Sequence, residues 1–213
     1  NGLETLLIIG DSTFASFMTL KFAEGQLIDN GPVSHVTLGA ASDIEITGGA
    51  VDLTNVIFDG SAVAESTTLI IGNSGSDVLS GGTMADTIVG GSSVDVMVGN
   101  GGDDTFRYDD DTDIQAGEFV DGGEGSDTIE LSAEFSLLAD FTSVIITSIE
   151  RLSMLGANQK ASLSPDQIAG LTEIQGSIGH QEVAVTASSI DLSALAFVSW
   201  GSRDLMVVSG TVD

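Results

Sequence analysis

The stretch GNSGSDVLSGGTMADTIVGGSSVDVMVGNGGDDTF, residues 72–106, carries an aspartate at every ninth position. In register it divides into GNSGSDVLS (72–80), GGTMADTIV (81–89), GGSSVDVMV (90–98) and GNGGDDTFR (99–107), and a fifth copy, GGEGSDTIE, occupies 122–130. Glycine is first in every copy, aspartate is sixth and a large apolar residue is eighth. A helix has a period near 3.6 and a strand a period of 2, so nine is the length of a larger structural unit.

We interpret the unit as a turn of about six residues followed by a strand of about three, in which only the eighth side chain points inward. These inward residues are Leu79, Ile88, Met97, Phe106 and Ile129. Two units make one coil of a flattened solenoid, so turns 18 residues apart stack on the same side. The sequence therefore predicts an all-β fold, a parallel β-roll or β-solenoid.

The turns have the composition of a cation site. Glycine allows positive φ and bends the backbone so that several carbonyl oxygens converge, and aspartate adds a charged oxygen. An oxygen-only ligand set suits a hard cation with six to eight ligands, which indicates calcium ahead of magnesium. The alternative, that these are ordinary Gly/Asp turns of a metal-free solenoid, stays open at this point.

Residues 72–130 resemble the glycine- and aspartate-rich nonapeptide repeats of the RTX (repeats-in-toxin) family. The resemblance implies a parallel β-roll with calcium ions between stacked turns, held by aspartate carboxylates and by carbonyls of neighbouring loop residues. It pairs Asp77 with Asp95, and Asp86 with Asp104. The metal-site residues that it implies are Asp77, Asp86, Asp95, Asp104, Asp113, Asp127, Gly72, Ser74, Gly75, Gly82, Met84, Gly90, Ser93, Gly99, Gly101, Gly102, Gly123 and Gly125.

The chain departs from the family pattern in two places. The fourth position, glycine in the family, is Met84 and Ser93 in the middle copies, so we expect strain or a different geometry there, and weak sites. Between the fourth and fifth copies, YDDDTDIQA (108–116) keeps Asp113 in phase without the glycines, and five more residues, GEFVD (117–121), precede the fifth copy. We interpret this segment as one degenerate unit plus a bulge, after which Asp127 faces Asp104 and Asp113 is the candidate partner of Asp95.

Composition limits the possible partners. The chain has 32 acidic and 5 basic residues, a formal charge of -27, which would repel nucleic acid and anionic membranes. Because 42% of its residues are hydrophobic, we expect it to fold, with cations relieving its self-repulsion. There is no cysteine for disulfides or thiolate metal sites, and no apolar run of membrane-spanning length. The N-terminus lacks both a methionine and a basic signal start, so we expect a piece of a longer protein.

A longer repeat of about 140 residues relates the two ends of the chain. The matching pairs are LETLLIIG (3–10) with IERLSMLG (149–156), VDLTNVIF (51–58) with IDLSALAF (190–197), and LIIGNSGSD (69–77) with VVSGTVD (207–213). The sequence thus predicts a strand-rich block at 1–71, calcium turns at 72–130 and a related block at 131–213, built as further solenoid coils or a small sandwich. Ser164, Pro165 and Gln167 predict one short helix, with an N-cap, a first-turn proline and a capping box. The blocks resemble the linkers between RTX clusters of large bacterial surface proteins.

No residue pattern indicates an enzyme. His35 and His180 fit neither a zinc site nor a hydrolase motif, and we expect both on the surface. The acidic run 109–113 with Asp103 is expected to fill outer coordination or solvate an edge rather than to supply an acid/base pair. Phe197 and Trp200 suit core packing better than a sugar-stacking platform.

We therefore expect a calcium-binding structural segment of a secreted or cell-surface bacterial repeat protein, an adhesin stalk or surface-layer component that folds on calcium after export. The expected partners are calcium, neighbouring modules of the same chain, and either other copies or a surface polysaccharide. The alternatives are an accessory β-roll of a secreted protease, lipase or polysaccharide epimerase, and a carbohydrate-binding module. The duplicated blocks argue against the first alternative, and the scarcity of basic residues against the second.

Overall fold

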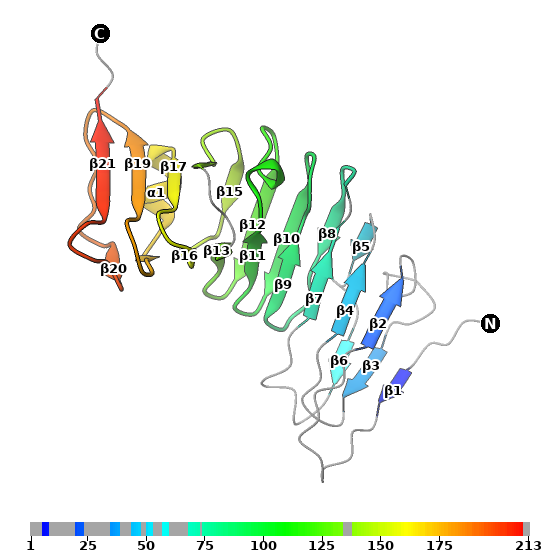
Figure 1. Ribbon diagram of the computed structural model, residues 1–213. Helices are drawn as coiled ribbons and strands as arrows, with labels where there is room; N and C mark the ends of the chain where they lie inside the picture. The colour runs from blue at the N-terminus through cyan, green and yellow to red at the C-terminus, as the bar shows by residue number, and fades with distance from the viewer. Residues whose placement is uncertain are drawn as a thin grey trace.

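The computed structural model describes the side chains of residues 69–72, 74–133 and 138–210, and the backbone of residue 68 and of six short strands nearer the N-terminus. These residues wind into a parallel β-solenoid whose coils follow one another along a single axis (Figure 1). The predicted all-β parallel fold is thus confirmed, and the described strands of the flanking segments continue the solenoid instead of forming a sandwich.

One sheet of nine parallel strands passes through all parts of the chain. In spatial order its strands are β2 (Leu20–Ala23), β4 (Ile44–Thr47), β7 (Thr68–Ile71), β9 (Asp86–Val89), β11 (Thr105–Tyr108), β13 (Thr128–Leu131), β16 (Arg151–Met154), β18 (Glu173–Gln175) and β20 (Ala196–Val198). The expected block boundaries follow residues 71 and 131. The sheet continues from β7 to β9 and from β13 to β16 without a break at either boundary.

Three shorter sheets supply the other strands of the coils. The sheet of five is β15 (Ile145–Thr147), β12 (Phe119–Glu124), β10 (Val96–Gly101), β8 (Val78–Ser80) and β5 (Ala50–Asp52). The sheet of four is β14 (Leu138–Asp140), β17 (Lys160–Leu163), β19 (Glu182–Thr186) and β21 (Leu205–Ser209). The sheet of three is β1 (Leu6–Ile8), β3 (His35–Leu38) and β6 (Ile57–Asp59).

The strand register confirms the coil length predicted for the repeats. Met97 pairs with Leu79 and Phe106 with Ile88, each 18 positions apart. The eighth-position side chains fill the interior, with exposed fractions of 0 to 3%. The next coil is longer, since Val120 pairs with Met97 at 23 positions. The five added residues are not a bulge at 117–121, because Phe119–Asp121 belong to β12 and pair with β10.

The predicted helix is present as α1 (Pro165–Gly170). The Ser164 hydroxyl accepts the Gln167 N–H at 3.2 Å, and the Gln167 side chain accepts the Ser164 N–H at 2.7 Å, which completes the capping box. The helix lies beside β15 and β19, where the sheet of five gives way to the sheet of four.

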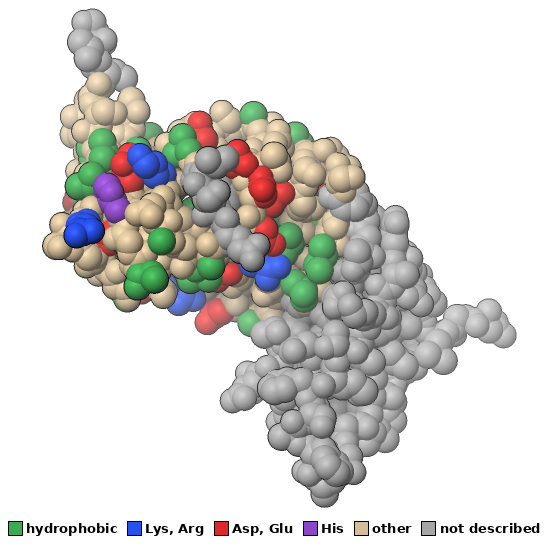
Figure 2. All heavy atoms as spheres, viewed as in Figure 1, with side chains coloured by type: hydrophobic (Ala, Val, Ile, Leu, Met, Phe, Trp, Pro, Cys, Tyr) green, Lys and Arg blue, Asp and Glu red, His purple; other side chains and the backbone are tan. Residues whose placement is uncertain are grey.

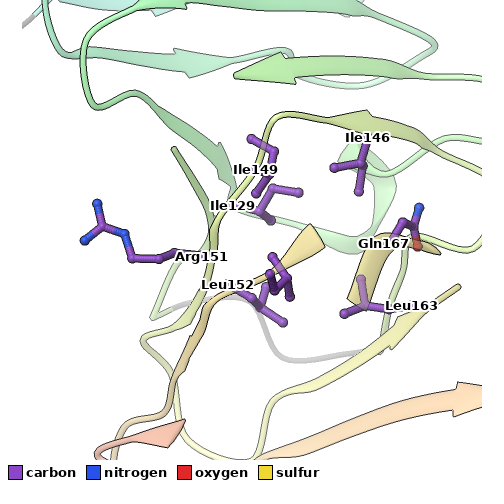
Figure 3. Close-up of a pocket in the computed structure, with 8 residues that line it drawn as sticks. Ile129, Ile146, Ile149, Arg151, Leu152, Leu163 and Gln167 are labelled. Carbon is purple, nitrogen blue, oxygen red and sulfur yellow. The ribbon is translucent and has the colours of Figure 1, made fainter. Parts of the chain in front are cut away.

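A small apolar cavity lies beside α1 in the interior of the solenoid. Figure 3 shows the aliphatic side chains pointing toward one another around this cavity, while Arg151 points away from it. The lining residues are Ile129, Ile146, Ile149, Arg151, Leu152, Leu163, Gln167 and Leu171. The Gln167 amide donates to the carbonyls of Phe141 and Val144, at 2.8 and 2.9 Å, so the polar group at the cavity wall is satisfied. The cavity is a packing feature of the core rather than a ligand site.

Candidate calcium-binding turns

The repeat turns stack in two columns. In the first column the Asp77 N–H donates to Asp95 Oδ1 at 2.9 Å. In the second, the Asp86 N–H donates to Asp104 Oδ1 and the Asp104 N–H donates to Asp127 Oδ1, both at 2.8 Å. Three of the four facing pairs expected from the sequence are therefore present, with each carboxylate anchoring the backbone of the coil before it.

The remaining carboxylate oxygens point into the turns. Oδ2 of Asp95, Asp104 and Asp127 is buried without a hydrogen-bond partner, whereas Oδ2 of Asp86 accepts the Gly82 N–H at 2.7 Å. Loss of hydration on burial raises the pKa of Asp95 to about 6 and of Asp104 to about 8, and it also raises the pKa of Asp127. A cation beside these oxygens would favour the charged form of the carboxyl groups.

The glycine that opens each turn leaves space in front of this oxygen. A methyl group at Gly81 would lie 2.5 Å from Asp86 Oδ2 and 2.6 Å from the Gly99 carbonyl oxygen of the next coil. The equivalent atoms are Asp77 Oδ2 and the Gly90 carbonyl in front of Gly72, and Asp104 Oδ2 and the Gly122 carbonyl in front of Gly99. Each of these cradles therefore joins a carboxylate and a carbonyl oxygen from two stacked turns.

The fourth position, where the two middle turns lack glycine, has a different backbone conformation in each of them. Gly102 and Gly125 are left-handed, with φ of 112° and 139°, and Gly123 at a second position has φ 102°. Ser93 adopts φ 85°, a conformation that costs a residue with a side chain about 1–3 kcal/mol. Met84 has no positive φ. Strain is thus found at Ser93 and a different turn geometry at Met84.

Other predicted loop residues lie on the same turns with their carbonyls already engaged. The Ser74 carbonyl accepts the Ser93 hydroxyl at 3.0 Å, and the Gly82 carbonyl accepts the Gly101 N–H at 3.2 Å. Gly75 is exposed on the first turn. These residues shape the turns, and the Gly90, Gly99 and Gly122 carbonyls face the carboxylates more directly.

Asp113 does not enter the first column. It ends the 3-10 helix η2 (Asp111–Asp113), and its Oδ2 accepts the N–H groups of Asp109 and Asp110 at 3.2 and 3.0 Å. The degenerate unit lacks the glycines that would continue the turn, so it forms a capped, exposed acidic loop instead. Figure 2 shows acidic side chains gathered over the middle of the described part.

Glu118 occupies the position expected for Asp113. Because Phe119 pairs with Val96, Glu118 follows Asp95 in the first column. It is fully buried, and burial raises its pKa to about 8.

The matches with known proteins agree with this geometry. The family of RTX calcium-binding nonapeptide repeats, in four copies, matches residues 71–106 and 117–133. These two segments of the chain are RTX calcium-binding nonapeptide repeats, and they lie in the parallel β-solenoid described above. No match was found among curated proteins or among solved structures.

RTX nonapeptide repeats bind calcium, and the turns of this chain fit that ion. Among the described residues, no three Asp, Glu, His or Cys side chains come together as a metal cluster. Each stacked pair of turns instead brings two aspartate carboxylates together beside a glycine carbonyl. The orphaned carboxylate oxygens, the carboxylate and carbonyl oxygens that meet at the opening glycines and the absence of nitrogen or sulfur from these donors all fit a calcium ion.

Beyond the RTX repeats, similar contacts involve residues that the nine-residue period does not contain: Glu150 extends the second column, and a separate column precedes the strands of the sheet of four. The Asp127 N–H donates to Glu150 Oε2 at 2.8 Å. Further along, the Gln159 N–H donates to Gln181 Oε1 at 3.1 Å, and the Gln181 N–H to Asp204 Oδ1 at 2.7 Å. Each acceptor, like Glu118, directly precedes a strand. This placement, and not the nine-residue period, marks these residues in the sequence.

Phe197, Trp200 and His180, which lie outside the repeats, make packing and hydrogen-bond contacts. Phe197 and Trp200 stack edge to face with ring centres 5.1 Å apart, and Trp200 packs against the core. The His180 N–H donates to Asn158 Oδ1 at 3.2 Å. His35 begins β3, and its side chain lies outside the described residues. No helix in the described part of the chain has the length and hydrophobicity needed to cross a membrane.

Proposed function

We propose that the RTX turns of this chain hold calcium ions between three stacked pairs of turns. The ligands of each pair are two aspartates and the carbonyl of an opening glycine. The sets are Asp77, Asp95 and Gly90; Asp86, Asp104 and Gly99; and Asp104, Asp127 and Gly122. Asp113 is not among them, because its carboxylate caps η2.

Folding of this segment is coupled to calcium. Without a cation, the solenoid buries carboxylates against one another: Asp86 and Asp127 both act on Asp104 in the direction of a higher pKa. Calcium supplies two positive charges per ion, and at ten times its dissociation constant it stabilises the fold by about 1.4 kcal/mol per independent site. Extracellular calcium modules have dissociation constants of about 10⁻⁴–10⁻³ M, so cytosolic calcium leaves such sites empty.

The biological role that follows is a structural segment of a secreted or cell-surface bacterial repeat protein, such as an adhesin stalk or surface-layer component. The chain would leave the cell unfolded and fold outside, where calcium is abundant. The observation that carries this role is the nine-stranded sheet, in which the calcium turns continue directly into coils without nonapeptides. A solenoid of this kind contacts only its neighbouring coils and grows by adding modules, which suits a spacer.

Circular dichroism of the chain in chelator and in millimolar calcium tests the calcium mechanism. We expect β-structure to increase on adding calcium, and millimolar magnesium serves as the control, because magnesium demands a stricter octahedral geometry. A spectrum that is unchanged by chelator would contradict calcium-coupled folding.

A further inference from the structure

The second carboxylate column extends one coil beyond the last nonapeptide. Arg151 pairs with Thr128, so Glu150 follows Asp127 in register. The Asp127 N–H donates to Glu150 Oε2 at 2.8 Å, the same contact that Asp104 makes with Asp127. Glu150 therefore repeats the backbone-anchoring role of a repeat aspartate, although it lies outside the repeats.

An unsatisfied carboxylate oxygen points into the space between these two coils. Asp127 has no exposed surface, and its Oδ2 has no hydrogen-bond partner. Gly122 opens the turn in front of it, and a methyl group there would collide with both Asp127 Oδ2 and the Ser148 carbonyl oxygen. The Ser148 carbonyl thus takes the place that the Gly122 carbonyl has in front of Gly99.

The charges that act on Asp127 are acidic, and the basic Arg151 nearby is engaged by a backbone carbonyl. The groups that act on Asp127 through their charge are Glu150, Asp103 and Asp121. Arg151 directs its guanidinium to the Ser126 carbonyl, at 2.9 Å. A divalent cation would therefore enter a site with an uncompensated negative charge and oxygen donors only.

A longer side chain compensates for a shorter turn. From Gly122 to Asp127 the chain advances five residues, whereas from Ser148 to Glu150 it advances two. Glutamate has one methylene more than aspartate, and this length carries its carboxylate to the backbone of Asp127.

We propose that Asp127, Glu150 and the Ser148 carbonyl hold a further calcium ion between the last repeat turn and the turn at 148–150. This proposal rests on the calcium binding proposed for the repeats and extends it to a turn without the RTX motif. The site closes the calcium-bearing part of the solenoid, since the position after Glu150 in the column is Thr172.

The opposite column ends differently and provides a control. Glu118 follows Asp95 there, but its Oε1 accepts the Tyr108 hydroxyl at 3.1 Å and its Oε2 accepts the Gln115 N–H at 3.2 Å. The nearest atoms in front of Gly90 belong to Asp95 and to the Met97 sulfur, with no carbonyl of the next coil among them. Glu118 is thus satisfied by the protein itself and holds no ion.

Native mass spectrometry of the metal-stripped 213-residue chain, titrated with calcium, counts the ions and tests the proposal. We expect Glu150→Gln to bind one calcium fewer than the wild type, and the matched control Glu118→Gln to bind the full number. Glu150→Asp, which keeps the charge and shortens the reach, should also lose one ion and serves if Glu150→Gln does not fold. Circular dichroism in calcium identifies which variants fold.

A full number of ions in either folded Glu150 variant would overturn this inference and leave the repeat sites untouched. A loss of one ion in Glu118→Gln as well would overturn it too, because the loss would then not be specific to Glu150. A wild-type chain that binds no calcium would instead refute the proposed function itself.

Discussion

Ser93 and Met84 occupy the same position in successive turns, but their backbones differ. The sequence predicts that both depart from the family pattern, because neither is glycine. Only the structure distinguishes them: Ser93 keeps the left-handed turn with φ 85°, and Met84 leaves it. The choice depends on packing, since the Met84 side chain contacts the core, whereas Ser93 lies at the surface of its turn and donates to the Ser74 carbonyl.

Glycine substitutions at the two positions should therefore have opposite effects. Ser93→Gly removes the cost of a left-handed side-chain residue and should raise the free energy of unfolding in calcium by about 1 kcal/mol. Met84→Gly removes core contacts and increases the freedom of the unfolded chain, so it should lower that free energy by about 1 kcal/mol or more. Urea unfolding at saturating calcium measures both, and equal shifts of the same sign would contradict the assigned geometries.

At the scale of secondary-structure elements, the nine-residue period predicts β8 to β11 and their partners but not the coils that follow. The inward side chains and the 18-residue stacking are local properties of a repeat that needs only its own turn geometry. Glu118, Glu150 and Gln181 are not predictable in this way, because the coils that contain them are 22 or more residues long. All three directly precede a strand. Glu150 and Gln181 accept a backbone N–H of the preceding coil, and Glu118 lies in register with Asp95 of that coil.

The repeat columns and the column that contains Gln159 and Gln181 also differ in how their buried side-chain oxygens are hydrogen-bonded. The repeat coils leave carboxylate oxygens without partners, whereas Gln159 and Gln181 are buried neutral amides. The Gln159 amide accepts the Gly156 N–H at 2.9 Å and donates to the Ser132 carbonyl at 2.5 Å, and the Gln181 amide donates to the Gly156 carbonyl at 2.9 Å. These coils therefore need no cation.

Hydrogen exchange should reveal this difference when calcium is removed. In chelator we expect amides of β17 and β19 to exchange about tenfold or more slowly than those of β8 to β11, because only the latter coils lose their counter-ions. With calcium restored, the two groups should become similar. Faster exchange in β17 and β19 than in β8 to β11 in chelator would contradict the idea that the amide column stands without metal.

At the scale of the whole molecule, topology and charge bear on how the solenoid is assembled. Two of the matching sequence pairs fall on β1 and β16 and on β6 and β20. β1 and β6 flank β3 in one sheet, and β16 and β20 flank β18 in another. Likewise, β2, β4 and β7 are neighbours in the nine-stranded sheet, and β17, β19 and β21 are neighbours in the sheet of four. This order is the one expected of a duplicated module. The nine-stranded sheet contains strands from all three blocks, so the division into blocks stays a prediction.

The acidic charge makes the calcium-free solenoid sensitive to pH. Burial raises the folded-state pKa of Asp95 to about 6 and of Asp104 and Glu118 to about 8, above the values of these groups in an unfolded chain. Groups with a raised folded pKa favour folding at low pH, and this contribution is lost as pH rises through the folded pKa. The calcium-free chain should thus be most folded near pH 4 and should lose β-structure between about pH 5 and pH 8.

Circular dichroism of the metal-stripped chain across this range measures the effect. Glu118→Gln should weaken the dependence at its upper end, and saturating calcium should abolish it near pH 8, because the ion holds the repeat carboxylates in their charged form. A calcium-free chain whose β-structure increases with pH would contradict the assignment of buried, protonated carboxyls.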